Sequence, residues 1–259
     1  MVLQNENFAV EESGLLLEAS LVTWDTEIFH YPVAQIERIQ VLDPAQSKQD
    51  YAAFESWRDA SLCELISCRL GHDRLRESML LEEKGFRFIE MVLHPRIENL
   101  DRLNIPDQGL NIAPAAESDI PALRNIAESA FTTDRFHIDP RIDPRCGDVR
   151  YGRWVANTLG HPRQQLLKIL DDETLIAFFI IEAKEDGSVY WHLTVVSPEF
   201  QGRGYGRRTW LAMLRRHNEK GHNAVSTTIS ARNISALNLY SSLSFRFSPP
   251  DMTFHWTKG

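Results

Sequence analysis

The sequence is poor in cysteine and has no long apolar run. Its three cysteines, Cys63, Cys68 and Cys146, are odd in number and scattered, which is typical of reduced thiols. The longest apolar run, Leu175 to Ile181, suits a buried strand and is too short to cross a membrane. No lysine or arginine precedes Arg38, so the charged start of a signal peptide is missing. We therefore expect a cytoplasmic protein without a membrane segment.

Charge and histidine spacing disfavour two further kinds of partner. The chain has 28 Lys and Arg against 36 Asp and Glu, a net charge of −8, which argues against a general nucleic-acid binder. Its nine His never fall at metal-ligand spacing with Cys or carboxylate partners, so we expect no metal. The 259 residues, 43% of them hydrophobic, are enough for one large or two ordinary domains with packed cores.

A glycine-rich turn between an apolar run and a helical run is the most informative segment. Glycines let backbone N–H groups approach an anion, and the start of a helix adds positive charge at the same point. Arg203, Arg207 and Arg208 add side-chain charge. The spacing fits neither a dinucleotide fingerprint nor a Gly-Lys-Ser/Thr phosphate loop, and a plain surface turn is the alternative. The turn consists of Gln201, Gly202, Arg203, Gly204, Tyr205 and Gly206.

Two segments resemble motifs of the GCN5-related N-acetyltransferases, the GNAT family. Gln201, Gly204 and Gly206 stand at the fixed positions of that family's pyrophosphate loop, Q/R-x-x-G-x-G/A. The stretch from Asn233 to Phe245 resembles its N-x-x-A-x-x-L-Y-x-x-x-G-F segment, with Ser244 in place of the usual glycine. A glycine there often ends the helix in a left-handed conformation, so we expect a differently shaped helix end in this chain.

The resemblance implies a fold, a cosubstrate and two catalytic groups. The fold is α/β (α+β): a central mixed, mostly antiparallel sheet flanked by helices. Acetyl-coenzyme A is the implied cosubstrate. The N–H of Val196 would polarise the thioester carbonyl, and Tyr240 would protonate the departing thiolate. The residues implied to contact the coenzyme are Val195, Val196, Gln201, Gly202, Arg203, Gly204, Tyr205, Gly206, Arg207, Asn233 and Tyr240.

The base for the acceptor amine and the acceptor site are less defined. His192 lies four residues before Val196, so strand alternation predicts that both share a face. His192 and Glu199 are candidate bases; a packed polar role for His192 and a water chain to a remote carboxylate stay open. Arg135, His137 and Asp139, in the polar loop 134–140, could recognise a phosphate, a sugar hydroxyl and an amine. That loop could also be a simple tether.

Periodicity and turn signals predict the elements of the C-terminal part. A Ser118-Asp119 cap and Pro121 start one helix, and Asp186-Gly187 makes a hairpin turn. The remaining helices are expected over 148–159 and 207–218 and after Asn233. Strands are expected over 110–113, 165–170, 175–183, 189–196, 225–229, 246–247 and 252–256.

The N-terminal part looks like a second, degenerate copy of the same unit. A linker over 101–109 predicts a partial GNAT-like domain over 1–105 and a catalytic GNAT domain over 106–259. Residues 75–94 match residues 234–253, with Phe86-Arg87-Phe88 on Phe245-Arg246-Phe247 but no tyrosine and no glycine loop. The W-D-[ST]-x-x-F pattern at Trp24 resembles the start of TDP-fucosamine acetyltransferases. We expect no coenzyme in this copy.

Three functions follow as hypotheses. The first is an N-acetyltransferase for the primary amine of a small soluble acceptor, with a nucleotide-linked amino sugar as one candidate. The second is a coenzyme-A-binding regulatory module without turnover, and the third is a protein or peptide acetyltransferase. We expect a small-molecule partner, neither nucleic acid nor membrane, and a monomer or homodimer.

Overall fold

The computed structural model describes residues 6–259, which fall into two compact units. The first unit is the chain up to Val92 together with Ile138–Ile142 and Pro249–Gly259, and the second is Leu93–His137 with Asp143–Ser248. The boundary expected near residue 105 lies inside the second unit. Two long strands, β5 (Arg87–Glu98) and β12 (Arg246–Thr257), contribute residues to both units, which is why the division does not follow the chain order.

The first unit has the strand order β1-β2-β3-β4-β12. β1–β2, β2–β3 and β4–β12 pair antiparallel, and β3–β4 pair parallel. Buried side chains of the strands pack with Tyr51, Phe54 and Leu81 from the helical segments, forming this unit's core. The strands are β1 (Asn7–Glu11), β2 (Leu15–Leu21), β3 (Val33–Val41) and β4 (Leu65–Gly71); the helices are α1 (Thr23–Phe29), α2 (Pro44–Asp50), α3 (Ala52–Ala60) and α4 (Leu75–Glu83).

The second unit has the strand order β5-β10-β9-β8-β7-β6. The β9–β10 pair is parallel, and β5–β10, β8–β9, β7–β8 and β6–β7 are antiparallel. The strands are β6 (Asn111–Pro114), β7 (Gln164–Asp171), β8 (Thr174–Ala183), β9 (Ser188–Val196), β10 (Ala224–Thr227) and β11 (Ile229–Ser230). The helices are α5 (Ile120–Ala130), α6 (Arg135–Ile138), α7 (Pro144–Thr158), α8 (Tyr205–Glu219) and α9 (Ile234–Ser242), with 3-10 turns η1 (Leu100–Arg102), η2 (Glu117–Asp119) and η3 (Pro198–Phe200).

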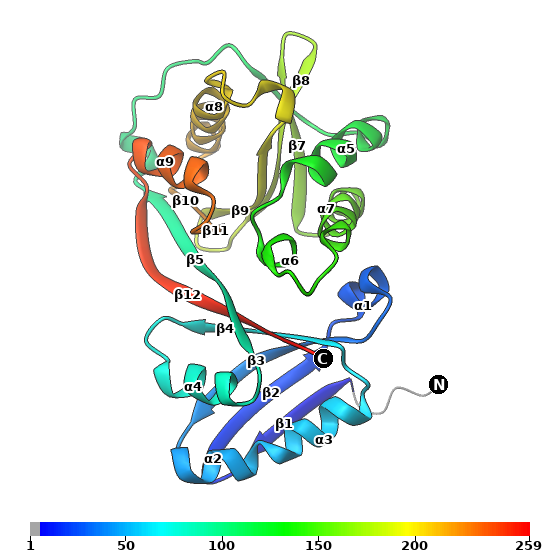
Figure 1. The fold of residues 1–259 in the computed structure, drawn as a ribbon. Helices are drawn as coiled ribbons and strands as arrows, with labels where there is room; N and C mark the ends of the chain where they lie inside the picture. The colour runs from blue at the N-terminus through cyan, green and yellow to red at the C-terminus, as the bar shows by residue number, and fades with distance from the viewer. Residues whose placement is uncertain (1–5) are drawn as a thin grey trace. The chain divides into compact units, whose positions relative to one another are not determined.

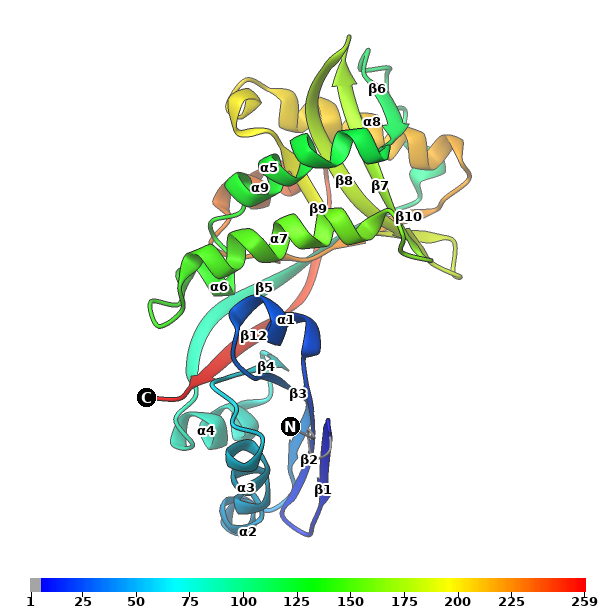
Figure 2. The same cartoon turned by 90° about the vertical axis from the view of Figure 1, so that its right-hand side faces the viewer.

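Helices cover both faces of the second unit's sheet. α8 and α9 lie on one side and α5 and α7 on the other (Figure 1), and α5 and α7 run next to each other (Figure 2). Trp191, Trp210 and Tyr240 belong to the core under α8 and α9, whereas Leu123 and Val155 belong to the core under α5 and α7. The mixed α/β architecture predicted from the sequence is confirmed.

A β-bulge changes which face the residues of β9 occupy. Ile181 pairs with Trp191 and Ile180 pairs with Leu193, so His192 is the extra residue of β9. Before the bulge Trp191 points into the core under α8, and after it Leu193 and Val195 point into the core under α5 and α7. Residues an even number of positions apart therefore lie on opposite faces of the sheet when the bulge falls between them.

Two expectations about element boundaries need correction. α7 begins at Pro144 rather than near 148, because the Asp143 carboxylate accepts the N–H of Arg145 and Pro suits the first helical position. The strands expected at 246–247 and 252–256 are one strand, β12. Its β4 pairing starts at Asp251, so the missing N–H groups of Pro249 and Pro250 cost no hydrogen bond to β4.

The matched segments of the two halves fold alike. α4 and α9 are both nine residues long, and β5 and β12 are both twelve. The N–H of Phe86 donates to the carbonyl of Leu81 and that of Phe245 to the carbonyl of Tyr240, so both helices end alike. Ser244 takes φ 63°, as Gly85 takes φ 87°, so the expectation of a differently shaped end at Ser244 is wrong.

Candidate active site

The parallel strands β9 and β10 stop pairing partway along β9. Their pairing runs from Ser188–Ala224 to Trp191–Thr227, where β10 ends, while β9 continues to Val196 along β8. The residues of β9 from His192 to Val196 therefore have no β10 partner on that side. We refer to this stretch as the open edge of β9.

The backbone of Val196 faces this gap. The N–H of Ser197 donates to the carbonyl of Ile176 in β8, and successive residues of a strand point to opposite sides, so the N–H and C=O of Val196 point away from β8. Gln201 Nε2 donates to the Val196 carbonyl at 2.9 Å. The first residue of the glycine turn thus holds the strand end and leaves the Val196 N–H directed into the gap.

The backbone of the glycine turn is open to its surroundings. Gly202 has φ 73° and Gly204 has φ 85°, conformations that other residues adopt only under strain, and no heavy atom lies within 4 Å of a Cβ placed on either. Gly204 caps α8, no side chain caps this helix start, and the first turn of a helix has N–H groups without intrahelical acceptors. The turn offers uncapped N–H donors at the positive end of α8.

The arginines around the turn are not equivalent. Arg208 forms an ion pair with Asp171 at 3.1 Å and donates to the carbonyl of Gln108, and its hydrogen bond is the main cause of the lowered pKa of Asp171. Arg207 donates to Ser242 Oγ at 3.1 Å across to α9. Arg203 is exposed between the two left-handed glycines. Arg203 is therefore the side chain best placed to meet an anion at the turn, whereas Arg208 holds α8 to Asp171 and Gln108.

α9 brings Asn233 and Tyr240 to the same region. Asn233 Oδ1 accepts the N–H of Ala236 at 3.0 Å and caps the helix. Tyr240 is fully buried, with its hydroxyl 3.5 Å from Thr194 Oγ1 on the open edge of β9. Burial raises the pKa of Tyr240 to about 12, so this hydroxyl keeps its proton at neutral pH.

His192 does not share a face with Val196, and that expectation is wrong. The bulge leaves the His192 ring against Trp154 of α7, whereas Val196 joins the core under α8. His192 Nε2 lies 2.8 Å from Glu182 Oε2, and Lys184 is the main cause holding the pKa of Glu182 at about 2. Because an ionised carboxylate can only accept, Nε2 carries the proton and Nδ1 holds the lone pair. Burial lowers the pKa of His192 despite Glu182, which favours the neutral ring.

The three acceptor candidates contact other side chains of the chain. His137 lies between Asp134 and Asp148; burial opposes its charge, but both carboxylates raise its pKa above the ordinary value. Gly147 leaves room for that ring, because a Cβ there would meet it at 2.3 Å. Arg135 lies over the ring of Phe136. These positions give His137 a structural role, and the acceptor role of the loop stays a prediction.

Asp139 belongs to the first unit and is similarly engaged. Its carboxylate accepts from Arg141 at 2.8 Å and lies 3.0 Å from His255 Nδ1, with the Asp139 side chain fully buried. Burial opposes the charge, yet the bonds from Arg141 and His255 hold the pKa of Asp139 well below its usual range. A buried carboxylate with these partners has no free oxygen facing an acceptor in this conformation.

Two kinds of feature are absent from residues 6–259. No helix of this part of the chain is long and apolar enough to cross a membrane. The same residues contain no group of three or more His, Cys, Asp or Glu side chains that could hold a metal ion.

Comparison with known proteins identifies the second unit's architecture. Residues 120–245, which include α5, the open edge of β9, the glycine turn and α9, match the model of the acetyltransferase (GNAT) family. Residues 120–245 therefore belong to the GNAT family. The chain is accordingly an acyltransferase, as the sequence predicted, and the glycine turn and α9 lie inside the matched segment.

Relatives and solved structures extend the likeness beyond the matched segment. The chain is 18% identical over 238 residues to the spore coat polysaccharide biosynthesis protein SpsD of Bacillus subtilis (strain 168), covering 89% of this chain and 79% of SpsD. A tandem GNAT protein from the clavulanic acid biosynthesis pathway superposes with TM-score 0.61 and 14% identity, covering 98% and 82% of the two chains. A GNAT from Sphaerobacter thermophilus gives TM-score 0.63 and 11% identity, covering 95% and 81%. The fold of GNAT proteins thus covers both units of this chain.

Proposed function

We propose that the second unit transfers an acetyl group from acetyl-coenzyme A to the primary amine of a small acceptor. The observation that carries the proposal is the Val196 N–H, which points into the gap beside β9 next to an uncapped glycine turn at the start of α8. One donor suits a thioester oxygen, and the other donors suit a pyrophosphate. The residues present therefore fit two polar groups of the coenzyme, its thioester oxygen and its pyrophosphate.

The coenzyme contacts follow from these donors. Gly202, Arg203 and Gly204 would offer the pyrophosphate N–H groups and one guanidinium, while Gln201 keeps the strand end in place through the Val196 carbonyl. Asn233 has its Oδ1 engaged in the helix cap, which leaves its amide NH₂ for a ligand. Acetyl-coenzyme A supplies the activated acyl group; the chain supplies the alignment and the proton transfers.

The base and the acid would act from opposite faces of the sheet. His192 Nδ1 holds a lone pair on the face of α7, and the Tyr240 hydroxyl holds a proton on the face of α9. In acyl transfer the amine must lose a proton while the departing thiolate gains one. A base on one face and an acid on the other would let the amine arrive on the side opposite to the leaving thiol. We assign His192 as base, positioned by Glu182, and Tyr240 as acid.

Replacing His192 by Gln should lower kcat/KM for acetyl transfer by roughly 10²-fold, the usual share of a general base. In the wild type the rate should fall as pH drops through the lowered pKa of His192, because protonation removes the base. That acid limb should vanish in His192→Gln. Glu182→Gln removes an influence that raises this pKa, so its limb should move to lower pH. A pH–rate profile of free-thiol release measures all three.

An acid limb that His192→Gln leaves in place would show that another group accepts the proton. Trp154→Phe serves as the control, because it alters the ring packed against His192 without removing the lone pair or the Glu182 contact. This control should change the rate by only a few fold and keep the acid limb.

A nucleotide-linked amino sugar is the acceptor class that we propose first. Its support is the relative SpsD, whose name places it in spore coat polysaccharide biosynthesis, and the resemblance of the first unit's Trp24 segment to TDP-fucosamine acetyltransferases. The test is a panel of amines, including nucleotide-linked and free amino sugars, polyamines and lysine peptides, assayed for thiol released from acetyl-coenzyme A. Thiol release with amino sugars alone supports the proposal. Release only with peptides would assign a protein acetyltransferase, and coenzyme binding without any release would assign a binding module.

A further inference from the structure

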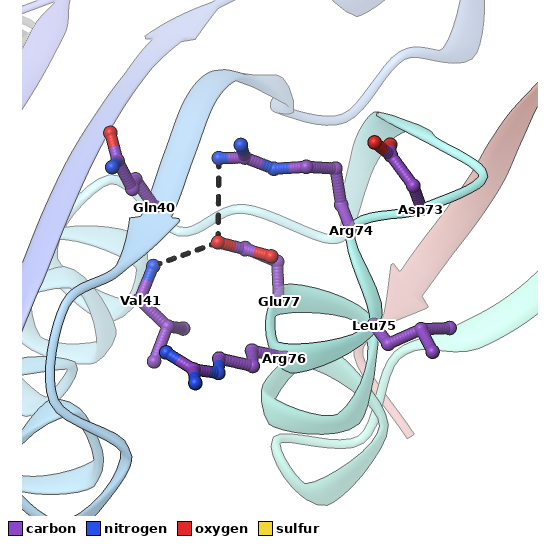
Figure 3. A pocket seen from close by; sticks show the side chains of 7 residues that line it. All are labelled: Gln40, Val41, Asp73, Arg74, Leu75, Arg76 and Glu77. Atoms are coloured by element: carbon purple, nitrogen blue, oxygen red, sulfur yellow. Dashed lines mark hydrogen bonds and ion pairs between the residues drawn. The ribbon is translucent and has the colours of Figure 1, made fainter.

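The first unit contains a pocket at the end of β3 and the start of α4. It has a volume of about 440 Å³ and is lined by Gln40, Val41, Asp73, Arg74, Leu75, Arg76 and Glu77. Figure 3 shows the Glu77 carboxylate between the backbone N–H of Val41 and the guanidinium of Arg74. Glu77 Oε1 accepts from the Val41 N–H at 3.0 Å, and the Glu77 side chain is only 7% exposed. A carboxylate of the chain itself thus fills the polar end of this pocket.

The strands around this pocket repeat those of the second unit. β3 and β9 are both nine residues long, and each carries its extra bulge residue, Glu37 or His192, at the fifth position. β3 pairs parallel with β4 only over its first four residues, as β9 pairs with β10. The end of β3 therefore also runs on without a parallel partner. This agreement includes the bulge, which a chance match of helix and strand would not reproduce.

The repeat places Val41 on Val196 and Glu77 on Ala236. The N–H of Leu42 donates to the carbonyl of Gly14, as that of Ser197 donates to Ile176, so the N–H of Val41 and of Val196 both point away from the antiparallel neighbour. Glu77 is the third residue of α4 and Ala236 the third residue of α9. The strand-end donor of the first unit is therefore occupied by Glu77, whereas the matching helix position of the second unit is Ala236, whose side chain has no acceptor.

The two units also differ at the start of the helix that follows this strand, which is α2 after β3 and α8 after β9. In the first unit α2 starts at Pro44, directly after Asp43, whose carboxylate accepts the N–H of Ala45 at 2.8 Å. In the second unit η3 and the glycine turn separate β9 from α8, and no side chain caps α8. In the second unit the strand-end N–H and the N–H groups at the helix start are the donors that would meet the coenzyme. In the first unit the carboxylates of Glu77 and Asp43 accept hydrogen bonds from the corresponding N–H groups.

We propose that the third residue of this helix decides whether a unit can take an acyl group: Glu77 closes the first unit from within, and Ala236 keeps the second open. The proposal deepens the proposed function, because it rests on the Val196 N–H as the group that receives the thioester oxygen. A carboxylate accepts a backbone N–H more strongly than a neutral carbonyl does, so a glutamate at this position outcompetes a thioester for the same donor.

Backbone amide exchange tests the proposal without any coenzyme. In Ala236→Glu the exchange rate of the Val196 amide should fall at least about tenfold, because this amide gains an acceptor. In Glu77→Ala the Val41 amide should exchange about tenfold faster or more. Asn238→Glu is the matched control, since it adds the same charge to an exposed position of α9 and should leave the Val196 amide unchanged. Residue-resolved NMR on the whole chain provides both readings.

Coenzyme titration supplies the second arm. Ala236→Glu should raise the Kd for acetyl-coenzyme A about tenfold or more, and Asn238→Glu should leave it unchanged. Unchanged exchange at Val196 in a folded Ala236→Glu protein overturns the proposal. If that variant does not fold, unchanged exchange at Val41 in Glu77→Ala overturns it instead. A wild-type chain that binds no acetyl-coenzyme A would refute the proposed function, while the two exchange readings would still decide whether this position opens or closes the strand end.

Discussion

Tyr240→Phe should lower turnover by roughly 10²-fold while coenzyme affinity and thermal stability change little. The substitution keeps the ring that packs against Trp210 and Phe245 and deletes one proton donor. The lost hydroxyl lies at the long distance of 3.5 Å from Thr194 Oγ1 and also interacts with the side chains of Trp210 and Thr227, so folding should lose about 1 kcal/mol. Steady-state thiol release and a thermal melt measure the two effects.

The pH dependence separates an acid from a packing residue. Burial raises the pKa of Tyr240 to about 12, so the hydroxyl should stay protonated across an ordinary assay range and add no alkaline limb. The deficit of Tyr240→Phe should shrink at low pH, where solvent can protonate the thiolate. Tyr51→Phe is a suitable control, because Tyr51 is equally buried with a raised pKa and lies in the first unit. Turnover within about twofold of wild type in Tyr240→Phe would leave Tyr240 as a core residue only.

Local signals were enough to predict most elements of the second unit. The glycine turn, the Asp186-Gly187 hairpin and the helix after Asn233 depend on residues close in sequence, whose backbone preferences do not need the rest of the fold. The same holds for the helix–strand match around Phe86 and Phe245, since both segments fold as a nine-residue helix followed by a twelve-residue strand. Family, fold class and class of reaction could therefore be reached from the sequence.

The bulge at His192 could not be predicted from the sequence of β9. The sequence of β9 alternates through the bulge without a break: Trp191, Leu193 and Val195 are buried although they lie on different faces, and His192 and Thr194 between them are half-buried, so the pattern gives no sign of the extra residue. The first copy does carry the signal. In β3 the core residues are Ala34, Ile36, Ile39 and Val41, and the step of three between Ile36 and Ile39 marks the bulge at Glu37. Transferring that irregularity to β9 would have placed His192 on the face of α7.

The acceptor candidates show a different limit. Arg135, His137 and Asp139 have the chemistry for recognition, but what they contact depends on residues distant in sequence. Asp148 approaches His137 from α7, and His255 approaches Asp139 from β12. The sequence alone does not distinguish a charged loop residue that pairs within the chain from one that is available to a ligand. The distinction requires the positions of the distant partners. Glu182, which positions His192 from a neighbouring strand, was missed for the same reason.

Gly204→Asp should weaken acetyl-coenzyme A binding at least tenfold, above ~1.4 kcal/mol. Gly204 has φ 85° and caps α8, so an aspartate there would strain the turn and place a negative charge among the N–H groups proposed to hold the pyrophosphate. Calorimetric titration of the folded variant measures the loss. Because nothing lies within 4 Å of a Cβ at this position, steric collision within the chain does not contribute.

Gly221→Asp separates the charge in the turn from strain in general. Gly221 has φ 81° and open space around it, and it follows the other end of α8, so the substitution brings the same charge and a similar strain. Both variants should lose about 1–2 kcal/mol of stability, and only Gly204→Asp should lose affinity. Equal affinity losses would attribute the effect to a destabilised α8. Wild-type affinity in Gly204→Asp would show that the pyrophosphate binds elsewhere, because no anion site at this helix start could tolerate a carboxylate within it.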